Sequence, residues 1–244
     1  MVKCVFIFGL ILLFFSCKKA EDRSCYKSYG GLIEKEIPLD SVSEFRLYKN
    51  ITYHVYQDTM RKLIVRTGDH LVNFILAENV DGVLTISNTN RCHFLRDYDK
   101  KTVVEIHYPF YNVIYSEAND SLIFKNTIVG NYLEVEQNLG GAAVVLDVDV
   151  NHIMMIASGG VARFVLSGNT NYADLRVQTN GSGDAENLKA NHIYVYNNST
   201  GDLVVDLDTA DATIHIKGTG NVNYFGNPDS LSLEKTGDGS LIKL

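Results

Sequence analysis

The sequence predicts an all-β protein whose second half is a β-solenoid, a stack of parallel strands with rungs of about twenty residues. The first observation is composition: the 244 residues include three prolines and no tryptophan, whereas Val, Ile, Leu, Tyr, Thr and Asn are plentiful. This composition favours strands and turns over helices. The second observation is a repeat, because asparagine recurs every twenty residues, and such a period is typical of stacked architectures. The recurring residues are Asn131, Asn151, Asn171 and Asn191.

Each repeat has the same pattern after its asparagine. A residue with an aromatic or imidazole ring, Tyr or His, follows directly. An apolar residue comes next, and glycines recur nine to ten residues further on. We therefore expect two short strands per rung with a glycine turn between them, and stacking would join their apolar faces into one core. The asparagines would form a structural ladder, with hydrogen bonds between their side-chain amides from rung to rung. An antiparallel meander gives the same turn spacing, but it would reverse direction at every strand. The ring residues are Tyr132, His152, Tyr172 and His192.

The regular repeats extend over about residues 111–244, and we expect an antiparallel or irregular β part before them. Apolar residues alternate with polar ones from Phe45 to Val55, as in half-buried strands. Asp81-Gly82 predicts a hairpin turn before the strand that ends at Ile86. Near the other end, Asp211 keeps the twenty-residue step, but its apolar residues, starting with Ala212, lie one position early.

The N-terminus predicts a lipoprotein signal peptide. Lys3 precedes an apolar run of eleven residues from Val5 to Phe15, which is too short for a transmembrane helix. Ser16 is a small residue before Cys17, whose thiol would receive the lipid. Phe14 and Phe15 depart from the strict pattern and resemble lipoprotein signals of the Bacteroidota. We expect cleavage of residues 1–16, a lipidated tether over residues 17–42, a β domain over residues 43–244, and anchoring in the cell envelope at the outer membrane, through two or more acyl chains.

The remaining cysteines predict a disulfide. Cys4 leaves with the signal peptide, so Cys25 and Cys92 are the pair left in an exported chain. A metal site is a poor alternative, because two cysteines and the nearby His93 do not complete a four-ligand zinc set.

Charge and motifs exclude several function classes. The formal net charge of −7 argues against nucleic acid as a partner. The sequence has no Gly-x-Ser-x-Gly elbow, no His-Glu-x-x-His pair and no nucleotide loop. We therefore expect no enzyme, no catalytic residue, no cofactor and no metal, and a polysaccharide-degrading β-helix is the least favoured hypothesis. Late acidic residues are interpreted as a solvated face, namely Asp184, Asp202, Asp206, Asp208 and Asp211.

Four segments resemble a known family. Gly218–Pro228 and Asn180–Leu188, with its Gly-Ser-Gly turn, resemble the GIN domain found as the head of putative auto-transporter adhesins. Thr102–Pro109 and Asp81–Ile86 occupy the places expected ahead of the repeats. The resemblance covers about residues 43–244 and implies a β-helix-like fold, a cell-envelope location and adhesion. It implies no catalytic residue. The other turns depart from Gly-Ser-Gly, which weakens any role of a glycine-rich turn face in binding.

Two functions remain in view. The first is an adhesin-like binding module that engages glycan or cell-surface protein through a solenoid face. The four ring residues, each directly after an asparagine of the ladder, could stack on sugars, although we favour the interpretation that they pack on one another. The second is a structural lipoprotein without a soluble ligand that self-associates through an exposed solenoid end, because uncovered edges invite pairing. Apolar residues of the last rung would favour that assembly if exposed, namely Leu231, Leu233, Leu241 and Ile242.

Overall fold

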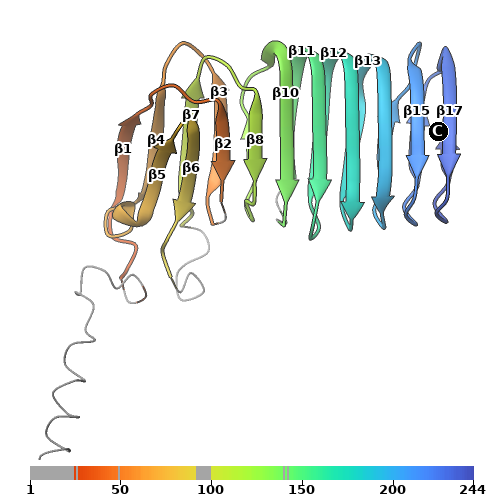
Figure 1. The fold of residues 1–244 in the computed structure, drawn as a ribbon. Coiled ribbons are helices and arrows are strands. Elements are labelled where there is room, and N and C mark those ends of the chain that lie inside the picture. The colour runs from red at the N-terminus through yellow and green to blue at the C-terminus, as the bar shows by residue number, and fades with distance from the viewer. Residues whose placement is uncertain (1–24, 26, 49, 92–99, 140, 142) are drawn as a thin grey trace, which may run out of the picture.

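The protein is an elongated stack of strands (Figure 1). The computed structural model describes residues 25, 27–48, 50–91, 100–139, 141 and 143–244. The elements of these residues are all strands, apart from one turn of 3₁₀ helix, η3 (Val72–Phe74). No helix in this described part is long and apolar enough to cross a membrane.

Long parallel strands form the middle of the stack. They are β10 (Ile128–Asn138), β11 (Ala143–Ser158), β12 (Arg163–Thr179) and β13 (Ser182–Ser199), and each pairs with the next in parallel. The register places Tyr132 beside His152, then Tyr172, then His192. Equal positions therefore lie one above another at the period of the sequence repeat. The predicted β-solenoid is confirmed, and the antiparallel meander is excluded.

Five shorter strands complete the C-terminal rungs. They are β14 (Leu203–Asp206), β15 (Asp211–Ile216), β16 (Val222–Phe225), β17 (Ser230–Lys235) and β18 (Leu241–Lys243), all in parallel pairs. His192 pairs with Asp211 and Ile193 with Ala212. The rung is one residue shorter here, which explains why the apolar pattern after Asp211 comes one position early.

The N-terminal part is a mixed sheet built from nine strands. They are β1 (Leu32–Pro38), β2 (Glu44–Leu47), β3 (Thr52–Gln57), β4 (Lys62–Gly68), β5 (Ile75–Val80), β6 (Val83–Asn88), β7 (Val103–Tyr108), β8 (Val113–Ser116) and β9 (Leu122–Phe124). β2 lies between β6 and β8, and β3 between β7 and β9, all in parallel. β8 and β9 then continue onto β10 and β11. The rungs therefore begin well before residue 111, in an order that differs from the chain order.

Antiparallel strands cover the N-terminal end of the stack. β1 pairs with β4, β4 with β7, and β5 with β6 through the predicted Asp81-Gly82 hairpin. Both turn residues have positive φ, 52° and 83°, as a two-residue hairpin turn requires. β1 also corrects one boundary, because residues 32–38 were expected in the tether but belong to the sheet. Their alternation is short and interrupted by charges, which suits an edge strand.

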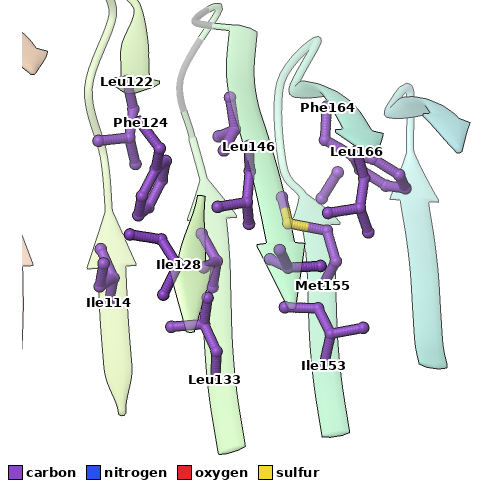
Figure 2. Packing of buried hydrophobic residues seen from close by; sticks show 14 of the residues in the cluster. Ile114, Leu122, Phe124, Ile128, Leu133, Leu146, Ile153, Met155, Phe164 and Leu166 are labelled. Carbon is purple, nitrogen blue, oxygen red and sulfur yellow. The ribbon is translucent and has the colours of Figure 1, made fainter. Parts of the chain in front are cut away.

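One hydrophobic core runs along the whole stack. Side chains at alternate positions point inward and stack on the same position of the next rung, so the buried cluster extends from Val42 to Val222. Figure 2 shows Leu133 and Ile153 from successive rungs lying side by side, with Phe164 further along the stack. In the N-terminal part, Phe45 and Tyr53 are fully buried, as the alternating pattern predicted.

A glycine ladder closes one turn of the C-terminal rungs. A Cβ at Gly201 would lie 2.2 Å from the carbonyl oxygen of Gly181, and a Cβ at Gly220 would lie 2.0 Å from that of Gly201. Gly239 repeats this close approach onto Gly220 at 2.1 Å. Successive turns thus pack backbone on backbone, which only glycine permits. The glycine spacing in the sequence is the result of this packing.

A buried asparagine fixes the same turn. The Asn197 side chain is fully buried. Its Nδ2 donates to the carbonyl oxygens of Gly201, Gly220 and Asn221 at 3.3, 3.1 and 3.0 Å, and its Oδ1 accepts from the Ser199 N–H at 3.0 Å. One amide therefore satisfies backbone groups of two successive rungs.

Candidate binding surface

The four predicted ring residues lie in one column on the outside of the solenoid. Their ring centroids are 5.2 Å apart between Tyr132 and His152, 4.8 Å between His152 and Tyr172, and 6.5 Å between Tyr172 and His192. The first two contacts are edge-on, a favoured aromatic geometry. The rings pack on one another, as we favoured, and the Tyr172 side chain remains exposed.

Burial changes along the column. Tyr132 is half-buried and its hydroxyl donates to Glu134 at 2.7 Å. Burial, together with the nearby Glu134 carboxylate, raises the pKa of Tyr132 to about 12. The His152 Nε2 atom is buried and has no hydrogen-bond partner among the described residues. Towards the C-terminal end, Tyr172 and His192 are open to solvent, so that half of the column can contact a ligand.

The column is one edge of a wider surface that the sequence analysis missed. Tyr194 and Tyr196 project outward from the same strand as His192. The residues that alternate with them, Ile193, Val195 and Asn197, point inward. Tyr194 lies 5.2 Å from His215 between ring centroids, and the Arg176 guanidinium lies 5.6 Å from the Tyr194 ring. We call this surface the ring face; it comprises Tyr115, Tyr132, His152, Tyr172, Arg176, His192, Tyr194, Tyr196 and His215.

Contacts with carboxylates hold the polar members of the ring face in place. Arg176 makes two hydrogen bonds of 2.7 Å to the carboxylate of Asp174, its neighbour two positions earlier on the strand. The bonds to Asp174 raise the pKa of Arg176. The His215 Nδ1 lies 2.8 Å from Glu234 on the last rung. The rings and the guanidinium are thus presented by strands with fixed side chains. The alternation Ile193-Tyr194-Val195-Tyr196 was the available sequence signal for the additional rings.

The predicted asparagines lie exposed at a corner of the solenoid, just before the ring column. One side-chain hydrogen bond of the expected ladder is present, from Asn191 Nδ2 to Asn171 Oδ1 at 3.0 Å. In the described part of the chain, the Asn131 and Asn151 side chains make no such bond. The ladder is therefore partial. Along this corner runs an open groove of about 530 Å³, the corner groove, lined by Val129, Gly130, Asp149, Val150, Asn151, Asn169, Thr170, Asn171, Lys189, Ala190, Asn191, Asp208 and Thr209.

The cysteine predictions fall largely outside the described residues. Cys17 and Cys92 are both outside the described residues, so the lipid anchor and the pairing of Cys25 with Cys92 stay predictions. Cys25 itself is disulfide-bonded.

The late acidic residues stabilise turns and ion pairs. Asp202 and Asp208 each accept a backbone N–H from the next rung, at 2.7 and 3.1 Å. Asp206 is buried and paired with Lys189, unlike the solvated position expected for it, because the lysine approaches from the neighbouring rung. No group of three or more His, Cys, Asp or Glu side chains in the described residues could hold a metal ion.

The last rung exposes apolar side chains at core positions. Leu231 is 42% and Leu233 47% exposed, whereas the residues paired with them on the preceding rung, Ala212 and Ile214, are buried. Antiparallel strands cover the N-terminal end, but the C-terminal rung presents its apolar positions directly.

Comparisons with known proteins agree with this architecture. The family described as "Putative auto-transporter adhesin, head GIN domain" matches residues 43–228. A structure titled a putative adhesin from Bacteroides fragilis superposes with a TM-score of 0.79 at 22% identity, covering 88% of this chain and 97% of that chain. A putative adhesin from Parabacteroides distasonis gives 0.66 at 18% identity, with coverages of 88% and 98%. A putative lipid binding protein from the same species gives 0.64 at 17%, with coverages of 88% and 97%. No curated protein matches the chain.

Proposed function

This chain belongs to the family described as the putative auto-transporter adhesin head GIN domain, and we propose that it is a non-catalytic, adhesin-like binding module that engages glycan through its ring face. The observation that supports this proposal most directly is the ring face itself. Its rings and the Arg176 guanidinium project from paired strands with fixed backbone geometry. Tyr and Arg are the residues most enriched where binding energy concentrates. A rigid platform also loses little conformational entropy when it binds.

Sugar rings offer apolar faces and polar edges, and the ring face matches both. Tyr172 and Tyr194 present aromatic surface, while the Arg176 guanidinium, held by the buried Asp174 carboxylate, supplies donors beside it. Side chains of this kind, apolar with a polar end, suit a partner that is partly wet. A protein partner is the other outcome that the experiment below can detect.

We expect alanine at Tyr172 or Tyr194 to weaken glycan binding by about fivefold each, equivalent to about 1 kcal/mol of lost aromatic contact. The measurement is binding of the purified protein to a glycan and host-protein array, followed by titration with the glycans that bind. Phe225→Ala is the matched control, because Phe225 and Tyr172 are both 38% exposed and Phe225 lies on β16, outside the ring face. Equal losses in Tyr172→Ala and Phe225→Ala would contradict a role of the ring face, and hits confined to proteins would favour a protein partner.

We also propose that the chain is exported and lipid-anchored in the cell envelope, at the outer membrane. The support is the N-terminal sequence, in which Lys3, the apolar residues to Phe15, and Ser16 precede Cys17. The membrane and its lipid would then be constant partners of the protein. The binding module would be held close to the bilayer surface.

Replacing Cys17 by alanine is expected to move the protein from the membrane fraction to the soluble fraction. Without the thiol no diacylglycerol can be attached, and stable anchoring needs at least two acyl chains. Immunoblots of fractionated native-host cells measure this, and Cys4→Ala is the control, because Cys4 lies inside the predicted signal peptide. Unchanged fractionation of Cys17→Ala would exclude the anchor.

The exposed last rung favours a second candidate, a structural lipoprotein that self-associates. Leu231 and Leu233 occupy core positions without a covering rung. A second copy could pair with β17 in antiparallel fashion, which would bring Asp229 of one copy near Lys235 of the other when Leu231 lies opposite Leu233. A blank array together with concentration-dependent oligomers in light scattering would favour this candidate over glycan binding.

A further inference from the structure

The corner groove runs along the axis of the stack. Its lining residues come from successive rungs, from Val129 and Gly130 on β10 to Asp208 and Thr209 just before β15. Rungs are spaced by about 4.8 Å, so the groove offers the same kind of position again at each step. A ligand that repeats along its own length is the natural match for such a site.

The groove has hydrogen-bonding groups without partners. Asn171 and Asn191 use one amide hydrogen and one oxygen for the bond between them. The amide nitrogen of Asn171 and the amide oxygen of Asn191 have no partner among the residues that the structure describes, and the same holds for the whole side chains of Asn151 and Asn169. Each amide combines two donors with an acceptor, which is the set needed to bind neighbouring hydroxyl groups.

The charge of the groove disfavours an acidic ligand. Lys189 is paired with the buried Asp206 carboxylate, which raises the pKa of the lysine and balances its charge. Asp149 and Asp208 also line the groove. Since the whole chain has a formal charge of −7, a polyanion would approach a surface of its own sign.

We propose that the corner groove binds a neutral, unbranched polysaccharide whose chain lies along the stack, with about one sugar at each rung. The proposal rests on the proposed glycan binding and specifies its ligand. Asn151, Asn171 and Asn191 each directly precede a ring of the column. A sugar held by these amides would therefore lie beside the edge of the ring face. Repeated weak contacts on one chain add up to higher affinity.

The test uses titration calorimetry with neutral gluco- and manno-oligosaccharides of increasing length, and with uronic-acid oligosaccharides of matching length. We expect the affinity for one neutral series to rise with each added sugar and to level off once the groove is spanned. Asn151→Ala and Asn171→Ala should each weaken binding by about fivefold, as expected for one lost hydrogen bond. Asn187→Ala is the control, because Asn187 is exposed and lies outside the groove.

The possible outcomes separate the groove from the ring face. Full affinity in the asparagine variants together with loss in Tyr172→Ala would overturn the groove and leave glycan binding by the ring face standing. Affinity independent of length, or tighter binding of the uronic-acid series, would also overturn the groove. No binding of any oligosaccharide by the unaltered protein would contradict the groove, and a blank glycan array with it would contradict the proposed function as well. Equal melting temperatures of the variants establish that they fold.

Discussion

Gly220→Ala is expected to destabilise the solenoid by about 3 kcal/mol, the upper range for forcing extra volume into a packed site. The added Cβ would lie 2.0 Å from the carbonyl oxygen of Gly201 and 2.6 Å from its carbonyl carbon. Both are backbone atoms, which cannot rotate away as a side chain can. Relief therefore requires the two rungs to separate, which would weaken the strand pairing between β14 and β16.

Thermal unfolding followed by circular dichroism measures this effect. For a domain of about two hundred residues, the expected loss lowers the melting temperature by roughly 6–12 °C. Gly130→Ala is the matched control, because a Cβ at Gly130 would meet no atom within 4 Å. A Gly220→Ala protein that melts with the unaltered one would show that the turns are not in contact as described.

The repeat could be predicted from sequence because it is a direct consequence of stacking. Residues that occupy equal positions in successive rungs meet the same surroundings, so the Asn-ring pair recurs wherever the corner recurs. The early apolar pattern after Asp211 was also visible, and the pairing of His192 with Asp211 explains it by a shorter rung. In these cases the number of residues between two equivalent positions in the sequence equals the number between two paired residues of successive rungs.

The order of the N-terminal strands could not be predicted in this way. β2 pairs with β6 and β8 although about thirty-five residues separate it from β6. Phe45 and Leu84 are neighbours in that pairing, but alternation shows only that each is buried, and does not identify its partner. The partner depends on how the whole N-terminal part folds back on itself, because no repeat is present to fix the register there.

The ring face was missed for a different reason. The twenty-residue repeat includes only the residue after each asparagine, so it indicates a single column of rings. Tyr194, Tyr196 and His215 are outward residues further along the strands, and no twenty-residue repeat links them, because the aligned position to Tyr194 on β12 is Asp174 and on β15 Thr213. Only the register reveals that they share a surface.

Asn197→Leu is expected to cost at least about 3 kcal/mol of unfolding free energy. The asparagine is fully buried, and leucine would remove hydrogen bonds to three carbonyl oxygens and one N–H. Each buried backbone group left without a partner costs about 1–3 kcal/mol, partly offset by the greater apolar surface of leucine. Because Gly201, Gly220 and Asn221 belong to two turns, the change should loosen the rungs from β14 to β18 most.

Urea unfolding measures the free energy, and amide hydrogen exchange locates the loss. Asn198→Leu is the control, since Asn198 is the exposed neighbour on the same strand and has no side-chain hydrogen bond among the described residues. Faster exchange is expected in β14–β18 of Asn197→Leu with little change in β2 and β3. Uniform loss of protection along the stack would instead mean that the solenoid unfolds as one unit, and equal unfolding midpoints for the two variants would mean that the buried amide does not fix the turn.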